Sequence, residues 1–423
     1  MSFESMWAAL EPVGRDSRTG GYRRFAWTAE DHTLREWFAG ECALRGLDLT
    51  EDRMGNQWAW WGDPDRASEG RRGVVAGSHL DSVPDGGAFD GPLGVVSALA
   101  AIDLLQAKAR AEGWQPSRPI GVVNFVDEEG ARFGVACAGS RVITGALDGD
   151  RARGLSDADG TTMAEAMARA GQDPRALGRD DETLARIGCF VELHVEQGRA
   201  LADPDHPAHG HPVAVGTGIW PHGRWRLDFP GEANHAGTTR LEHRHDAMLG
   251  YAHAVLTARA AAEQHGCLAT IGKVGVQPGG VNAIASAVTG WLDARGADES
   301  AVRAAVAQVA AEAERAGASL AEESWTPPTA FDAGLAERLR RVLATIPTSA
   351  TPHPQPAGTP LLGTGAGHDA GILANAGVPT AMLFVRNPTG VSHSPDEWAE
   401  ADDCQAGVTA LAAVLEDLAG ESA

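Results

Sequence analysis

The chain has 423 residues, 43% of them hydrophobic, and a formal charge of -22. This length exceeds the usual size of a single hydrophobic core, so we expect two domains. The negative charge disfavours nucleic acid and anionic membranes as partners. The five cysteines are scattered and form no CxxC pair, which argues against a disulfide framework and a thiolate zinc site. Because the sequence shows neither a signal peptide nor an apolar run of about 18 residues, we expect a cytoplasmic protein that binds no membrane.

The first half of the chain has the pattern of βαβ units. From Gly73 to about Val215, short apolar runs alternate with helical stretches: GVVAGSHL, GVVSALAAIDLLQAKARA, PIGVVNFV and CFVEL. The runs are almost wholly apolar, as in strands covered on both faces, and they predict an α/β fold with a mostly parallel sheet. Ligands of such sheets bind beyond the carboxyl ends of the strands. The residues that follow each run are therefore the first candidates for chemistry.

A different pattern begins after residue 216, where Trp225, Leu227 and Phe229 alternate with polar residues, as in a sheet with one solvated face. Further elements are expected at 242–264 (helix), 268–274 and 288–293 (strands), 298–315 (helix) and 319–325 (strand), in the order βαββαβ. After Pro328 the first pattern resumes with VPTAMLFV and a helix at 401–418, and proline-rich 351–360 is predicted to be a surface loop. We expect a catalytic domain of residues 1–216 and 328–423, and an inserted α+β domain of residues 217–327.

Polar clusters follow four of the apolar runs. The first, GSHLDSVPDGGAFDG, contains His79, Asp81 and Asp90. His79 and Asp81 are two residues apart and can lie on one side of the strand end, where Asp81 would hold the second ring nitrogen of His79. Asp90 is a carboxylate able to bridge two cations. For this motif alone, a helix-capping aspartate and a loop histidine are the simpler interpretation.

The second cluster, Asp127, Glu128 and Glu129, directly follows the run VVNFV. Three like charges at the mouth of a buried strand cost free energy unless a cation or a proton compensates them. A solvated turn is the alternative interpretation. Beside a two-metal site, one glutamate would be a ligand and its neighbour the general base.

The other two clusters contribute histidines: His194 in FVELHVEQG and His393 in GVSHSPDEW. A single histidine of this kind is more often a hydrogen-bonded structural residue than a ligand. Together, however, the four clusters supply two carboxylates and three imidazoles, which suit zinc, manganese, cobalt or nickel better than magnesium or calcium. The sequence therefore predicts that these clusters form a metal site.

These motifs resemble those of the amidase, hydantoinase and carbamoylase branch of the M20 metallopeptidase-like family, which includes allantoate amidohydrolase, N-carbamoyl-L-amino-acid amidohydrolase and β-ureidopropionase. The matching motifs, in the family's order, are GSHLDSVPDGGAFDG, DEEGARFG, ELHVEQG, NHAGTT, VNAIAS, LDAR, GAGHDA and SHSPDE. The resemblance implies that His79 and His194 bind one metal ion. It assigns Glu129 and His393 to the other ion and Asp90 to both. A histidine at position 194 is typical of this branch, whereas the peptidase branches tend to carry a carboxylate there.

By the same resemblance, Glu128 would be the general base that takes a proton from a water between the metals. We also expect Asp81, which would hold the ring of His79, to be a catalytic residue, and His235 to stabilise the oxyanion of the intermediate. The implied substrate-binding residues are Gln197, His235, Asn282, Arg295 and His368. The guanidinium of Arg295 suits a substrate carboxylate. Three of these residues lie in the inserted, ferredoxin-like domain, which would act as a lid and would also form a homodimer, with His235 acting in its own or the partner subunit.

We therefore expect metal-dependent hydrolysis of a carbamoyl or other linear non-peptide amide bond in a small carboxylate-bearing substrate. Allantoate or an N-carbamoyl-L-amino acid would release ammonia and carbon dioxide. The alternatives are an aminoacyl dipeptidase of the same architecture and a hydrolase of N-formyl or N-formimino amino acids. A metal-binding protein without catalysis would keep the ligands but would gain nothing from Glu128. Arg240 and Ala285 stand where relatives often have proline, and with His222 they leave the substrate open.

Overall fold

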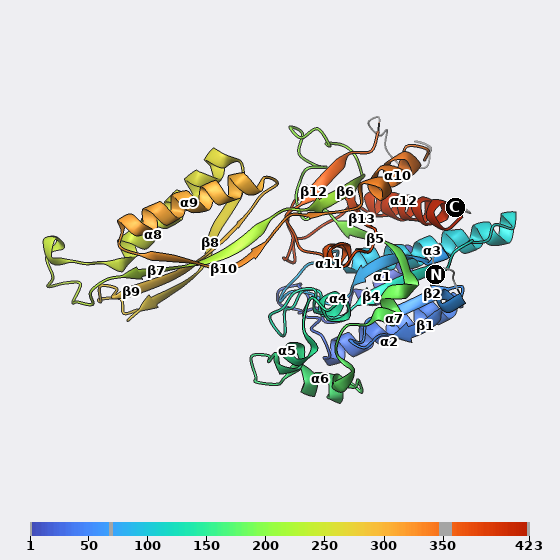
Figure 1. Ribbon diagram of the computed structural model, residues 1–423, viewed down its shortest axis with the longest axis horizontal. Helices are drawn as coiled ribbons and strands as arrows, with labels where there is room; N and C mark the ends of the chain where they lie inside the picture. Colours follow the sequence, from blue (N-terminus) through green and yellow to red (C-terminus); the bar gives the residue numbers. More distant parts are fainter. Residues whose placement is uncertain (1, 67–70, 347–357, 421–423) are drawn as a thin grey trace. The chain divides into compact units, whose positions relative to one another are not determined.

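The structure, a computed structural model, describes residues 2–66, 71–346 and 358–420, which form two compact units (Figure 1). The larger unit comprises Met1–Gly218, Ala330–Leu362 and Gly367–Ala423. The smaller unit comprises Ile219–Thr329 together with the short segment Gly363–Ala366. Most of the loop predicted at 351–360 lies outside the described residues.

The larger unit contains most of a nine-stranded sheet in the order β1-β2-β4-β3-β5-β13-β6-β11, with β12 beside β6. The strands are β1 Asp48–Glu51, β2 Gln57–Trp61, β3 Gly73–His79, β4 Ile120–Phe125, β5 Ile187–Val195, β6 Val213–Ile219, β11 Thr329–Ala330, β12 Leu361–Thr364 and β13 Thr380–Val385. The central strands β4, β3, β5 and β13 pair in parallel, whereas β1–β2, β2–β4 and β13–β6 are antiparallel pairs. The predicted α/β fold with a mostly parallel sheet is confirmed for this central region.

Helices cover this sheet on both faces. They are α1 Phe3–Leu10, α2 Ala29–Leu44, α3 Pro92–Glu112, α4 Ala138–Thr144, α5 Gly149–Gly154, α6 Met163–Arg169, α7 Asp181–Arg186, α10 Ala333–Leu343, α11 Asp369–Asn375 and α12 Ala401–Gly420. Val74 and Ala76 of β3 belong to the same core cluster as α3 and α12, and every residue of β3 is buried. This two-sided burial explains why the strand sequences are apolar throughout.

Among the described residues, α3 is the one helix that is long and apolar enough to cross a membrane. However, 67% of its most apolar 18-residue segment is buried inside the protein. It packs against α12 and against strands β3, β4 and β5. Its apolar character therefore has an explanation in the core of the larger unit.

The smaller unit is an antiparallel four-stranded sheet with two helices on one face (Figure 1). Its elements are β7 His222–Pro230, α8 Ala247–His265, β8 Leu268–Gln277, β9 Ala287–Arg295, α9 Glu299–Arg315 and β10 Ser319–Thr326. The order of elements is βαββαβ, as the sequence predicts, and the sheet order is β10-β7-β9-β8. Trp225, Leu227 and Phe229 form its core, while Arg224 and Arg226 on the same strand are exposed.

Some elements differ from the sequence prediction. Helix α8 begins at Ala247 and not near residue 242, because Asp246 accepts the N–H of Met248 as its cap and 241–243 form a separate 3-10 turn. Strand β8 extends to Gln277, three residues beyond the predicted end. The antiparallel strands β1 and β2, which lie before Gly73, are not among the predicted elements.

Alanine substitutions at a closely packed glycine of α3 and at an exposed glycine of α2 are expected to have opposite effects on stability. A Cβ at Gly94 of α3 would collide with the main-chain oxygen of Leu193 and the side chain of Ser78. We expect Gly94→Ala to lower the free energy of unfolding by about 1–3 kcal/mol, the usual cost of overpacking. At Gly40 of α2 nothing lies within 4 Å of the added atom, so Gly40→Ala should stabilise the protein by about 0.5–1 kcal/mol. Urea unfolding of both variants measures this, and equal effects would contradict the packing.

Candidate metal centre

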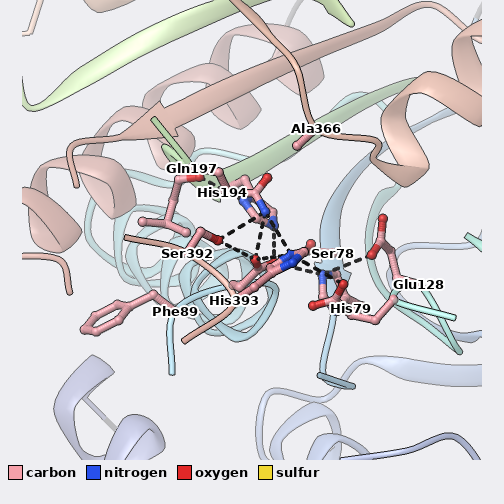
Figure 2. A network of polar contacts seen from close by, with 12 residues as sticks. Ser78, His79, Phe89, Glu128, His194, Gln197, Ala366, Ser392 and His393 are labelled. Carbon is pink, nitrogen blue, oxygen red and sulfur yellow. Dashed lines mark hydrogen bonds and ion pairs between the residues drawn. The ribbon is translucent and has the colours of Figure 1, made fainter. Parts of the chain in front are cut away.

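The predicted metal ligands lie at one edge of the parallel sheet. His79 is the last residue of β3, Glu129 follows β4, and His194 is the last residue but one of β5. Since these strands are parallel neighbours, their carboxyl ends meet at the same edge. His393 reaches the same place from the loop after β13, with its backbone in the left-handed region (φ 56°). Figure 2 shows the three histidines converging there.

The carboxylate of Asp90 lies between the histidine rings. Its Oδ1 is 3.1 Å from Nε2 of His194 and 3.6 Å from Nε2 of His79. Its Oδ2 is 3.4 Å from Nε2 of His393, which is itself 3.7 Å from Oε2 of Glu129. Two groups of potential ligand atoms therefore share Asp90, and within each group the atoms lie within 4.8 Å of one another.

The protonation of two of these rings is set by main-chain carbonyls. Nδ1 of His79 lies 3.1 Å from the carbonyl oxygen of Asp81, and Nδ1 of His194 lies 2.9 Å from that of Val195. A carbonyl only accepts, so each Nδ1 donates, and in the neutral ring Nε2 keeps its lone pair. Both Nε2 atoms are buried and face Oδ1 of Asp90, but neither makes a hydrogen bond of good geometry among the described residues. Unpartnered buried nitrogens of this kind fit a metal ion that is held by imidazole and carboxylate groups.

The charges at this site depend strongly on one another. Burial disfavours an ionised Asp90, but the surrounding histidines, His194 first, hold its pKa well below the ordinary value. Burial disfavours a charged His194, but Asp90 raises its pKa. Burial and the charge of Asp90 raise the pKa of Glu129 to about 7. In the absence of a cation, protons on these groups compensate the buried carboxylates, and a divalent ion would do the same in their place.

Asp81 connects the segment after β3 with the segment after β4. Its carboxylate accepts the N–H groups of Glu128 (3.2 Å) and Glu129 (3.0 Å), and its Oδ1 is 3.3 Å from Nδ1 of His79. The two glutamates then face different partners: Oε2 of Glu128 is 3.7 Å from Nε2 of His79, whereas Glu129 faces His393. Burial raises the pKa of Glu128 well above its usual range. Asp81 thus holds the turn that separates the two glutamate side chains.

One residue that supports Asp90 is missing from the sequence prediction. Oε1 of Glu397 accepts the N–H groups of Phe89 (2.7 Å) and Asp90 (2.8 Å), and its Oε2 accepts the hydroxyl of Ser392 (3.2 Å). The same hydroxyl also lies 3.1 Å from Oδ2 of Asp90. Glu397 is part of the motif SHSPDE, but it follows no apolar run and so gave no signal of its own.

Two of the predicted substrate-binding residues lie at this site. Gln197 donates from Nε2 to Oδ2 of Asp90 at 2.8 Å, and its Oε1 is buried without a partner among the described residues. The ring of His368 lies 4.5 Å from that of His194, and its Nε2 is likewise unpartnered. Burial holds the pKa of His368 well below its usual range, so its ring is neutral. The structure thus places Gln197 directly on a predicted metal ligand.

The other three predicted residues belong to the smaller unit. His235 and Asn282 are neighbours, since Ala236 donates to the main-chain oxygen of Asn282, and both side chains are exposed. Arg295 is paired with Asp293 through two hydrogen bonds of 2.8 and 2.7 Å. Asn282 lies before the first residue of β9 and Arg295 is its last residue, so the two lie toward opposite ends of a strand that spans roughly 26 Å. Within one chain, the structure does not bring Arg295 together with the other two residues.

Comparison with known proteins identifies the family to which the chain belongs. The sequence model of peptidase family M20/M25/M40 matches residues 75–417. The chain is 34% identical over 418 residues to an N-carbamoyl-L-amino acid amidohydrolase of Geobacillus stearothermophilus, covering 96% of both proteins. It is 30% identical over 419 residues to the allantoate amidohydrolase of Escherichia coli (strain K12), covering 97% of this chain and 96% of the relative. The crystal structure of an amidase of the hydantoinase/carbamoylase family from Burkholderia multivorans matches with a TM-score of 0.83 at 28% identity, covering 100% of this chain and 99% of that one. The chain therefore belongs to peptidase family M20/M25/M40, and the family predicted from its motifs is confirmed.

Proposed function

We propose that this protein hydrolyses the linear carbamoyl C–N bond of a small ureido acid, either allantoate or an N-carbamoyl-L-amino acid. The family and its amidohydrolase relatives make it a hydrolase of C–N bonds other than peptide bonds. The observation that carries the proposal is the pair of ligand groups that share Asp90, with Glu128 beside them. The products would be ammonia, carbon dioxide and an amine.

We propose that His79, Asp90 and His194 hold one divalent cation, and that Asp90, Glu129 and His393 hold a second. The unpartnered Nε2 atoms of His79 and His194 support this assignment. Bound cations would supply Lewis acidity, which polarises the substrate carbonyl and lowers the pKa of water. Imidazole and carboxylate ligands suit zinc, manganese, cobalt or nickel.

Glu128 is the proposed general base. Its carboxylate takes a proton from the attacking water and returns it to the nitrogen that leaves as ammonia. The remaining N-carboxy amine then loses carbon dioxide. Asp81 positions the base, because it accepts the main-chain N–H of Glu128. Gln197 and His368 lie beside Asp90 and His194 and are proposed to contact the substrate.

The smaller unit is proposed to act as a lid and to form a homodimer. Arg295 would bind the substrate carboxylate, while His235 and Asn282 would hold the polar head, with His235 also stabilising the oxyanion. Arg295 and Asn282 lie toward opposite ends of β9, which spans roughly 26 Å, so we do not expect a small substrate to contact both in one chain. We therefore propose that His235 and Asn282 act on the substrate of the partner subunit. Exposed leucines of α8, Leu249 (64%) and Leu256 (69%), provide apolar surface for such an assembly.

Replacing the proposed base tests the reaction. We expect Glu128→Gln to lower kcat for ammonia release by about 10²–10⁴-fold, because a positioned general base contributes this much, while the metal content is unchanged. Glu129→Gln is the matched control, since it alters the neighbouring carboxylate and should reduce metal content. The substrates are allantoate and N-carbamoyl amino acids, with dipeptides and N-formyl amino acids in parallel. Near wild-type kcat in Glu128→Gln, or turnover of dipeptides alone, would contradict the proposal.

The support of Asp90 by Glu397 predicts a metal-binding defect at a residue that is not itself a ligand. Glu397→Ala leaves the N–H groups of Phe89 and Asp90 without their acceptor. We expect the affinity for the metal to fall about 10–100-fold, as for other groups that orient ligands. Glu397→Gln should lose less, because its amide oxygen can accept the same two bonds. Chelator competition measures both variants, and wild-type affinity in Glu397→Ala would show that Asp90 needs no such support.

Subunit complementation tests where His235 acts. The single variants Glu128→Gln and His235→Ala should each be inactive. If His235 serves the partner's site, half of the sites in a mixed dimer are intact. Co-expression should then restore about a quarter of wild-type activity, given random pairing of two subunits. If His235 serves its own chain, every site in the mixture lacks one group and no activity returns.

A further inference from the structure

Cys137 lies against the carboxylate that we propose as the general base. Its Sγ is 3.2 Å from Oε1 of Glu128, and the residue is only 2% exposed. Burial, with the nearby charge of Glu128, raises the pKa of the thiol well above its usual range. The group is therefore a thiol at neutral pH, and its S–H can donate a hydrogen bond to the carboxylate.

The main chain around Cys137 also holds the turn that carries Glu128. At the start of α4, the N–H groups of Cys137, Ala138 and Gly139 donate to the carbonyl oxygens of 128, 127 and 126. Cys137 itself is in the left-handed region (φ 55°), and this conformation directs the chain into the helix. Cys137 thus contacts both the main chain and the side chain of Glu128.

The two oxygens of the Glu128 carboxylate differ as a result. Oε1 faces the thiol. Oε2 is 3.7 Å from Nε2 of His79, on the side of the proposed metal ligands, and Figure 2 shows Glu128 beside His79. A hydrogen bond at Oε1 occupies a lone pair on that oxygen and restrains the orientation of the carboxylate. The free lone pairs of Oε2 are then the ones that face the reaction.

We propose that Cys137 is a positioning residue, whose thiol fixes the Glu128 carboxylate so that Oε2 receives the proton of the attacking water. The proposal rests on the proposed role of Glu128. The proton moves from water to Oε2 and from Oε2 to the leaving nitrogen, while the thiol keeps its own proton throughout. Cys137 touches neither substrate nor metal ligand in this scheme and acts only through Glu128.

Three variants test the proposal. Cys137→Ala removes the donor, and we expect kcat to fall about tenfold, with KM and metal content within twofold of wild type, because a hydrogen bond to a charged group contributes on this order. Cys137→Ser restores a donor and should recover most of kcat. Cys189→Ala is the matched control: this thiol is also buried and free, but it lies on β5 and no contact with Glu128 is found. It should leave kcat unchanged even if it lowers stability.

The proposal is overturned if Cys137→Ala keeps wild-type kcat, if Cys137→Ser is as slow as Cys137→Ala, or if the loss in Cys137→Ala follows a loss of metal. A second measurement does not depend on turnover. The S–H stretching band of Cys137, isolated as the infrared difference between wild type and Cys137→Ala, should lie below that of Cys189 and should shift in Glu128→Gln. A band at the position of a free thiol also overturns the proposal. Wild-type protein that releases no ammonia from any ureido acid would instead overturn the proposed function.

Discussion

The buried carboxylate of Asp90 is the group on which the site of the larger unit depends. A carboxylate removed from water costs several kcal/mol unless opposite charge and hydrogen bonds compensate it. Three imidazole nitrogens lie within 3.1–3.6 Å of Asp90, and Gln197 and Ser392 donate to its Oδ2. The three imidazole rings, the Gln197 amide and the Ser392 hydroxyl therefore all face the carboxylate of Asp90. Changing any of them changes the protonation of the others.

The parallel sheet makes this convergence possible. Neighbouring strands lie about 4.8 Å apart, so side chains that leave the ends of β3, β4 and β5 come within ligand distance of a common point. Residues more than 100 positions apart, such as His79 and His194, meet because β3 and β5 pair directly. Glycine is required beside them: a Cβ at Gly91 (φ 86°) would collide with the His79 ring. The ring is therefore confined by main chain as well as by its hydrogen bond.

The sequence could predict the parts of the site that follow from strand ends. His79, Glu129 and His194 each lie at the end of an apolar run or after it. Because such a run predicts a strand that is buried on both faces, the residues at its end are expected at the carboxyl edge of the sheet. It could not predict the contacts that come from loops, because these have no periodicity. Glu397 reaches Asp90 from a loop after β13, and Gln197 turns toward Asp90 although the motif alone suggested the substrate. Such contacts depend on the packing of segments that are distant in the chain.

The start of helix α8 and the strands β1 and β2 could not be predicted for a related reason. Nothing in the periodicity of 242–264 distinguishes a helix from the 3-10 turn that precedes it, since the cap at Asp246 acts locally on one N–H. Similarly, the strands β1 and β2 form an antiparallel pair at the sheet edge, and QWAWW has no regular alternation that would separate its two faces. In both cases the sequence has no repeated pattern from which the bounds of the element could be predicted.

The hydrogen bonds that Arg295 makes inside the smaller unit bear on its proposed recognition of a substrate carboxylate. Two of its N–H groups donate to Asp293 and a third to the main-chain oxygen of Gly365. A guanidinium has five N–H donors, so two remain for a ligand. Asp293 offsets only part of the positive charge here, because its Oδ2 also lies 3.6 Å from Nε of Arg224. Attraction to a substrate anion would therefore draw on directed hydrogen bonds as well as on Coulomb forces. Because the guanidinium is already fixed, binding would cost little side-chain entropy, and recognition would depend on the shape of the anion.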